Sequence, residues 1–381
     1  MRQLKYDEVT GMWFRRMLLE EWFDKYQYEI RYNVGESAVH CLTFADIDID
    51  LRHVSLRYGY HAGKPELREV IADQYEGLSS EHVVVTNGGS EALFSVAACL
   101  LKPGDHVIVE HPNYPSNYEV LRSLGCKVDL LHLEFENDFQ LDLNELKALM
   151  TPQTKLVCLT HPNNPTGSMI SEKTLEETVD LIESRGCFMV FDETYRELAF
   201  GHKLPTAASA SSKAVSISTM SKSYGLPGIR IGWIATKDKF ILESVLAIRE
   251  QVTICNSAIS EVIALSVLER KDEFLENVRR HVERNSQTVV SWMENQKELE
   301  WKRPEAGVIC FPRIKLDVFL NPENLYQLLV EKYKTFVIPG RCFEMDNRHF
   351  RLGYGGMPRE LEVGLKNIGK ALKEVVDSTS F

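Results

Sequence analysis

The segment with the clearest chemical potential is Ser221–Arg230, which reads Ser-Lys-Ser-Tyr-Gly-Leu-Pro-Gly-Ile-Arg. It lies between two apolar runs, where a lysine is unusual because its charge is costly to bury. Burial lowers the pKa of a lysine, so we expect a neutral Lys222 amine that can attack a carbonyl. Gly225 and Gly228 allow the backbone to pass close to a ligand, and Arg230 can grip a phosphate with two hydrogen bonds. The alternative is a surface loop that carries a stray lysine and arginine.

Three further segments place polar side chains at the ends of apolar runs. The run Phe188–Asp192 ends on an acid, and an acid at the carboxyl end of a parallel strand points into the crevice where such sheets bind ligands. Val83–Thr86 continues into a glycine-rich turn that opens a helix, which favours phosphate binding at the helix N-terminus. His161–Gly167 reads His-Pro-Asn-Asn-Pro-Thr-Gly, which is typical of a turn. Taken singly, each also has a structural explanation, namely a helix cap, an N-cap at Ser90 and a plain turn.

Together these segments resemble the class I/II aminotransferases, the fold-type-I enzymes that depend on pyridoxal 5′-phosphate (PLP). The lysine signature of that family is Ser-Lys-x-x-Gly-x-x-Gly-x-Arg, and the resemblance extends in order from about residue 55 to 375. It implies PLP as cofactor, with Lys222 as the Schiff-base lysine and proton shuttle between the substrate Cα and the cofactor C4′. The residues implied to hold the phosphate are Gly89, Ser90, Thr219, Ser221 and Arg230.

The resemblance also implies partners for the cofactor ring and the substrate. Asp192 would hold the pyridine nitrogen, while Tyr195 and Asn164 would bond the ring's 3′-oxygen. The aromatic ring of Tyr114, in Pro-Asn-Tyr-Pro, would stack on the pyridine ring. Arg351, in Phe-Arg-Leu-Gly-Tyr, would grip the substrate α-carboxylate with Asn164 beside it. The nearby Arg348 is interpreted as a surface charge.

The segment Arg57–Arg68 resembles the family's tyrosine segment that crosses a dimer interface. The resemblance implies a homodimer in which Tyr58 reaches the phosphate in the partner's site, with Tyr60 as the alternative. The small-molecule partners implied are an amino acid and a 2-oxo acid.

One stretch departs from the family pattern. Many members have a Gly-Glu-Pro-Asp-like stretch near the start, whereas this chain has Gly-Glu-Ser-Ala-Val-His-Cys-Leu-Thr-Phe at residues 35–44. With Leu19–Trp22, this stretch resembles the start of enzymes of the capreomycidine synthase type, which share the fold but eliminate and cyclise their substrate. In that case His40 would lie near the substrate; otherwise it is an ordinary loop histidine.

Composition narrows the class of protein. The chain has 381 residues, enough for two domains, and a net charge of −11, which argues against nucleic-acid binding. No apolar run approaches the roughly 20 residues of a membrane span, and Met1–Trp13 lacks the apolar region of a secretory signal. Eight cysteines without a Cys-x-x-Cys pair indicate buried free thiols in a reducing compartment, so we expect a cytoplasmic protein without a metal site.

The remaining pattern predicts the elements that position these residues. Short Val-, Ile- and Leu-rich runs alternate with helical segments between residues 82 and 236, which indicates an α/β fold with a mostly parallel, seven-stranded sheet between helices. Residues 45–255 are predicted to form this large PLP-binding domain. Residues 1–44 and 256–381 are predicted to form a small α+β domain, with an amphipathic helix at 17–28 and one long helix at 260–296.

Transamination of an amino acid to a 2-oxo acid is the function that this pattern favours. The same residues would also support a β- or γ-eliminase or a cyclase of the capreomycidine synthase type. A non-catalytic PLP-binding regulatory protein is a third possibility, but the segment ahead of residue 45 lacks a basic helix-turn-helix pattern.

Overall fold

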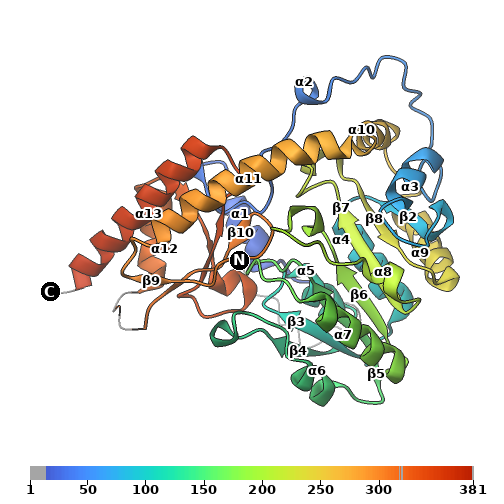
Figure 1. Ribbon diagram of the computed structural model, residues 1–381, viewed down its shortest axis with the longest axis horizontal. Helices are drawn as coiled ribbons and strands as arrows, with labels where there is room; N and C mark the ends of the chain where they lie inside the picture. Colours follow the sequence, from blue (N-terminus) through green and yellow to red (C-terminus); the bar gives the residue numbers. More distant parts are fainter. Residues whose placement is uncertain (1–13, 317, 319–320, 380–381) are drawn as a thin grey trace, which may run out of the picture.

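The computed structural model describes residues 14–316, 318 and 321–379 (Figure 1). The interpretation of Met1–Trp13 therefore concerns a segment outside the described residues. None of the helices in the described part is long and apolar enough to cross a membrane.

A seven-stranded sheet forms the centre of the large domain. Its order is β2-β8-β7-β6-β5-β3-β4, and all neighbours are parallel except β8, which is antiparallel to both β2 and β7. The central strands are buried on both faces, as their continuous apolar sequences require. The predicted α/β fold is therefore confirmed. The strands are β2 (Val83–Thr86), β3 (His106–His111), β4 (Lys127–His132), β5 (Thr154–Thr160), β6 (Phe188–Asp192), β7 (Ala214–Thr219) and β8 (Gly232–Ala235).

Helices cover both faces of this sheet (Figure 1). On one face, α4 and α9 pack together and share an apolar core with the strands, in which Val96 and Val245 are buried. Helix α7 begins at Ser171, whose side chain caps the Thr174 amide, and ends at the left-handed Gly186. The helices of this domain are α2 (Phe44–Ile47), α3 (Pro65–Ala72), α4 (Gly89–Leu100), α5 (Ser116–Ser123), α6 (Leu143–Leu149), α7 (Glu172–Arg185), α8 (Ala207–Ala210) and α9 (Lys239–Val252).

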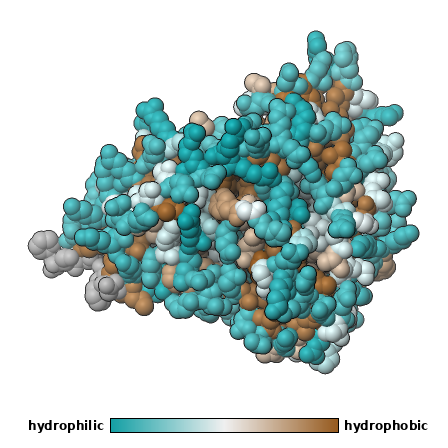
Figure 2. Space-filling model, in the orientation of Figure 1, coloured by the Kyte–Doolittle hydropathy of each residue, from teal (hydrophilic) through white to brown (hydrophobic). Residues whose placement is uncertain are grey.

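The N-terminal helix packs with the C-terminal part of the chain to one side of the sheet. Strand β1 pairs in parallel with β12, and the Trp22 indole donates to the Val337 carbonyl at 2.9 Å. Hydrophilic residues cover most of the face that carries α11 and α13 (Figure 2). The elements are α1 (Leu18–Tyr26), β1 (Tyr32–Asn33), α11 (Lys271–Met293), β9 (Leu299–Glu300), β10 (Ile309–Cys310), β11 (Arg313–Ile314), α12 (Pro322–Glu331), β12 (Thr335–Phe336), β13 (Ile338–Pro339), β14 (Phe350–Gly353) and α13 (Pro358–Thr379). Short 3-10 helices are η2 (Ser80–His82), η3 (Phe135–Asn137), η4 (Arg196–Leu198), η5 (Pro227–Ile229) and η6 (Gly340–Phe343).

The prediction of a single long helix at 260–296 is wrong. The structure has two helices, α10 (Ala258–Leu268) and α11, with a break at Arg270, whose guanidinium bonds the Ile47 carbonyl and the Ser266 carbonyl. Helix α10 packs on α3 of the large domain, and Ile263 and Val267 join the same apolar cluster as Leu67. This tertiary contact turns the chain, and no glycine or proline at the break marks it in the sequence. The division into domains at residue 256 stays a prediction, since α10 lies on the large-domain side.

Strand β8 does not follow the Ser221–Arg230 segment directly but begins at Gly232. Residues Pro227–Ile229 form η5, and Arg230 follows in the left-handed region with φ 54°. All eight cysteines are free, but only Cys158, Cys187, Cys310 and Cys342 are buried. Cys41 is exposed, so the expectation that the thiols are buried holds for half of them.

Candidate active site

Lys222 follows β7 on a loop that faces the segment Gly35–Thr43. Its amine donates to Ser37 Oγ at 3.1 Å and lies 3.5 Å from Glu36 Oε1. Burial is the largest single influence on the amine and opposes its charge, but Glu36, Tyr195 and Tyr114 together outweigh burial and raise the pKa of Lys222 above its usual value. The expected neutral amine is therefore wrong for the protein without a cofactor, because no motif marks the carboxylate of Glu36 as a neighbour of Lys222. Burial likewise opposes ionisation of Glu36, yet the charges of Lys222 and Arg351 hold the pKa of its carboxyl below the usual range.

Asp192 ends β6, at the same edge of the sheet as Lys222. Its Oδ1 accepts the Thr194 amide at 3.0 Å, and burial raises the pKa of this carboxyl. A buried carboxyl with one amide donor is suited to a further proton-bearing partner. Tyr195 follows on the next turn, is buried, and donates its hydroxyl to the Ser37 carbonyl at 2.8 Å. Burial raises the pKa of Tyr195, so its hydroxyl stays a donor at neutral pH.

Arg351 comes from β14 of the small domain and is fully buried. Its Nη2 and Nε donate to the Gly35 carbonyl at 2.8 and 3.2 Å, and its Nη1 donates to Asn164 Oδ1 at 3.1 Å. Asn164 lies on the turn after β5, so the two residues predicted to hold the substrate carboxylate are in contact. All partners of this guanidinium are neutral oxygens, so an incoming carboxylate would be its first anionic hydrogen-bond partner.

Tyr114 lies on the turn between β3 and α5. Its hydroxyl donates to Glu20 Oε1 of α1 at 3.3 Å. Burial raises the pKa of Tyr114, and the charges of both Glu20 and Lys222 act on its hydroxyl. The ring predicted to stack on the cofactor is therefore held against the N-terminal helix α1.

A cradle for an anion forms where the turn before α4 meets the end of β7. A Cβ added to Gly232 would lie 2.6 Å from the Gly88 carbonyl carbon and 2.7 Å from the Gly89 nitrogen. The backbone at the start of β8 is therefore in direct contact with the backbone of the turn before α4. Gly88 has φ +79°, and a side chain there would strike the Arg230 guanidinium. On the neighbouring strand end, Thr219 Oγ1 bonds Ser221 Oγ at 2.9 Å.

These features fit PLP. The predicted phosphate residues Gly89, Thr219, Ser221 and Arg230 lie around one cradle, and Ser90 is exposed in the first turn of α4. Amide groups at a helix N-terminus, hydroxyls and a guanidinium are the donors that a phosphate requires. Arg230 bonds the Pro227 carbonyl through one nitrogen at 3.0 Å and is exposed, which leaves donors for a ligand. Gly225 approaches the His40 carbonyl rather than a ligand, and a Cβ at Gly228 would meet open space.

The segment Gly35–Thr43 bridges the two halves of the site. Its amides at Val39 and Leu42 donate to the Lys222 and Gly225 carbonyls, and the amide of His40 donates to the Gly355 carbonyl. Glu36 and Ser37 were not predicted as contacts of Lys222, because this stretch departs from the family pattern and carries no motif of its own. Glu20 was not predicted either, since no motif marks it. The side chain of His40 is exposed.

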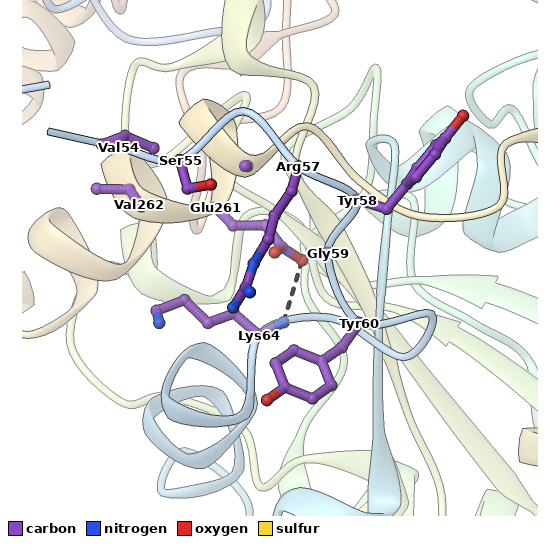
Figure 3. Close-up of a pocket in the computed structure, with 10 residues that line it drawn as sticks. Val54, Ser55, Arg57, Tyr58, Gly59, Tyr60, Lys64, Glu261 and Val262 are labelled. Carbon is purple, nitrogen blue, oxygen red and sulfur yellow. Dashed lines mark hydrogen bonds between the residues drawn. The ribbon is translucent and has the colours of Figure 1, made fainter. Parts of the chain in front are cut away.

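Tyr58 lies on the surface with 81% of its area exposed. It lines a pocket with Arg57, Tyr60 and Lys64, in which the Lys64 amide donates to Glu261 Oε1 at 3.1 Å. In Figure 3, the Tyr58 ring points away from this hydrogen bond. Its predicted role depends on a second chain and stays a prediction. Arg348 pairs with Asp346 through its Nε at 2.9 Å.

Comparison with known proteins defines the family. The model of the family described as aminotransferase class I and II matches residues 27–368. Capreomycidine synthase of Streptomyces vinaceus is 29% identical over 367 residues, which is 93% of each chain. The solved structure of a PLP-dependent aminotransferase from Streptococcus suis matches with a TM-score of 0.90 and 30% identity, covering 96% of this chain and 99% of that chain. The structure of the PLP-dependent cyclase OrfR matches with a TM-score of 0.88 and 27% identity, with the same coverage.

The family and these structural neighbours use one cofactor, so PLP is the cofactor of this protein. The chain belongs to the class I and II aminotransferase family of PLP-dependent enzymes.

Proposed function

We propose that the protein transfers the amino group of an α-amino acid to a 2-oxo acid, with Lys222 as the reacting lysine. The observation that carries the proposal is the grouping of Lys222, Asp192 and Arg351. Lys222 donates to Ser37 Oγ and Arg351 donates to the Gly35 carbonyl, so both contact the same short segment, and the charge of Lys222 also acts on Asp192. An amine, a carboxyl for a ring nitrogen and a guanidinium for an α-carboxylate are the three groups that transamination needs around one substrate.

PLP, when bound, withdraws electrons from the substrate α-carbon and so makes its proton acidic. Arg351 and Asn164 fix the substrate α-carboxylate, which sets the direction of the bonds at Cα. Asp192 would hold the ring nitrogen and keep a proton on it, and Tyr195 and Asn164 would donate to the ring's 3′-oxygen. Lys222 would act as the base that removes the Cα proton and as the acid that returns a proton to the cofactor.

Elimination or cyclisation is the second candidate, because one observation favours it. The segment Gly35–Thr43 brings Ser37 and Glu36 to Lys222, so two further polar groups lie beside the reacting amine. The likeness to capreomycidine synthase extends over this segment and 93% of the chain. A non-catalytic role has no such support, since no polar residue of the proposed site is missing.

A single-turnover reaction tests the proposal. The purified holoenzyme is mixed with each of a panel of amino acids without any 2-oxo acid, and the cofactor and products are followed by absorbance and mass spectrometry. Transamination converts the cofactor to its amino form and releases the 2-oxo acid in equal amount. A product that forms while the cofactor keeps its aldehyde oxidation state indicates elimination or cyclisation, and an absence of reaction with every amino acid contradicts both.

We also propose that the active form is a homodimer in which Tyr58 reaches the phosphate of the partner's site. The high exposure of Leu56, Tyr58 and Tyr60 on one segment supports an interface there, since large apolar groups seldom cluster in water without a partner. Light scattering of the holoenzyme should give twice the 43.6 kDa chain mass. A monomer with full activity would contradict this proposal.

A further inference from the structure

Glu20 is a carboxylate that the proposed chemistry does not use. It lies in the first turn of α1, whose Leu19 and Trp22 are buried against the small domain. The indole of Trp22 is bonded to the Val337 carbonyl and its ring stacks with Phe336 at 6.2 Å between centroids. The helix is therefore held in place, and with it the position of Glu20.

Glu20 faces the active site through Tyr114. Its Oε1 accepts the Tyr114 hydroxyl at 3.3 Å, and the charge of Lys222 reaches the same hydroxyl. Because Arg351 holds the substrate α-carboxylate and Lys222 reacts at its amino end, the side chain of the substrate must leave in another direction. Tyr114 is predicted to stack on the cofactor ring, so Glu20, which accepts the Tyr114 hydroxyl, is the carboxylate that we place beside this path.

The carboxylate of Glu20 lacks a cationic partner within the part of the chain that the structure describes. No lysine, arginine or histidine nitrogen there lies within 4.0 Å of it, and the one hydrogen bond it accepts uses one of about four acceptor positions. Glu36 differs in this respect, because Lys222 and Arg351 already act on it. A half-buried carboxylate without a cation favours a ligand that supplies one.

We propose that Glu20 recognises the cationic end of the substrate's side chain, so that the substrate is an α-amino acid of the arginine or lysine class. This inference rests on the proposed function, since it concerns the same substrate site. It assigns Glu20 to specificity rather than to the chemical step, because its hydrogen bond leads to Tyr114 and not to the reacting amine.

The test compares L-arginine with L-citrulline, which has the same shape without the charge. Equilibrium dissociation constants are measured by calorimetry in PLP-loaded Lys222→Ala, which cannot turn over, with and without Glu20→Gln. Glu21→Gln is the matched control, because Glu21 is the next residue on α1, is exposed, and loses the same charge. Turnover of both amino acids by protein with Lys222 intact gives the second readout, the ratio of kcat/KM for arginine over citrulline.

The inference predicts that arginine binds more tightly than citrulline, and that Glu20→Gln lowers this preference by about 10- to 100-fold, the effect of losing a hydrogen bond to a charged group. Glu21→Gln should leave the preference unchanged, and Glu20→Asp should keep part of it. Equal binding of the two amino acids, or a preference that survives Glu20→Gln, would overturn the inference. A binding preference that depends on Glu20 without turnover of any amino acid would support the inference and contradict the proposed function.

Discussion

Replacing Arg351 by alanine separates the substrate anchor from the rest of the site. The side chain is fully buried and donates three hydrogen bonds, two to the Gly35 carbonyl and one to Asn164 Oδ1. Truncating one partner of a buried, hydrogen-bonded charge pair costs about 2–5 kcal/mol. If Arg351 binds the α-carboxylate, Arg351→Ala therefore lowers kcat/KM for the amino acid about 30- to 5,000-fold.

The same substitution leaves two buried acceptors without their donor. Each such group costs roughly 1–3 kcal/mol, so the free energy of unfolding should fall by roughly 2–6 kcal/mol. Activity must be measured below the unfolding transition of the variant, which circular dichroism against urea defines. Arg351→Lys keeps a charge but loses the planar fork, and its kcat/KM should lie between those of wild type and Arg351→Ala.

Arg348→Ala is the matched control, three residues away and paired with Asp346 outside the site. Its kcat/KM should stay within about threefold of wild type, because an exposed ion pair contributes only about 0–1 kcal/mol. A kcat/KM unchanged in Arg351→Ala, with Arg348→Ala giving the larger loss, would refute the assignment of the substrate anchor.

Three further predictions concern the cofactor and the core. Gly88→Ala should weaken PLP binding by at least about tenfold in equilibrium dialysis, because the new methyl strikes the Arg230 guanidinium and φ +79° strains an alanine; unchanged affinity would place the phosphate elsewhere. Asp192→Asn should lower kcat by about 100-fold or more while the fold persists, because an amide cannot hold a proton on the ring nitrogen; an equal kcat would remove Asp192 from that role. Burial raises the pKa of Glu193 from 4.5 to about 7, so the folded state holds a proton that the unfolded state loses, and stability should fall by about 3 kcal/mol as pH rises from 4.5 through 7. Glu193→Gln keeps an oxygen for the Ser216 hydroxyl and the Ala207 amide but cannot ionise. Urea titrations of this variant between pH 4.5 and 7 should therefore lack the fall in the free energy of unfolding that Glu193 causes in the wild type.

Local patterns were sufficient to predict the sheet. Strand β6 has the predicted bounds Phe188–Asp192, because an apolar run is a property of a few neighbouring residues. The break between α10 and α11 was not predictable in this way, since it depends on Arg270 reaching Ile47 from 223 positions away in the chain.

The site shows the same division. Lys222 and Arg351 carry motifs, and the fold brings both to the segment Gly35–Ser37, from the loop after β7 and from β14. The pKa of Lys222 was predicted to be lowered, but it is raised. The prediction could not include Glu36, which lies 186 positions earlier in the chain. Glu20 could not be predicted from any motif, because its contact with Tyr114 depends on how helix α1 packs in the folded protein.

The central claim is that Lys222 is the residue covalently linked to PLP. Borohydride reduction of the holoenzyme fixes this link, and mass spectrometry of the peptides locates it. The account predicts one phosphopyridoxyl group per chain, on the peptide that contains Lys222, and none in Lys222→Ala. A phosphopyridoxyl group on another lysine, or an unmodified Lys222 peptide from protein that retains PLP and activity, would contradict it.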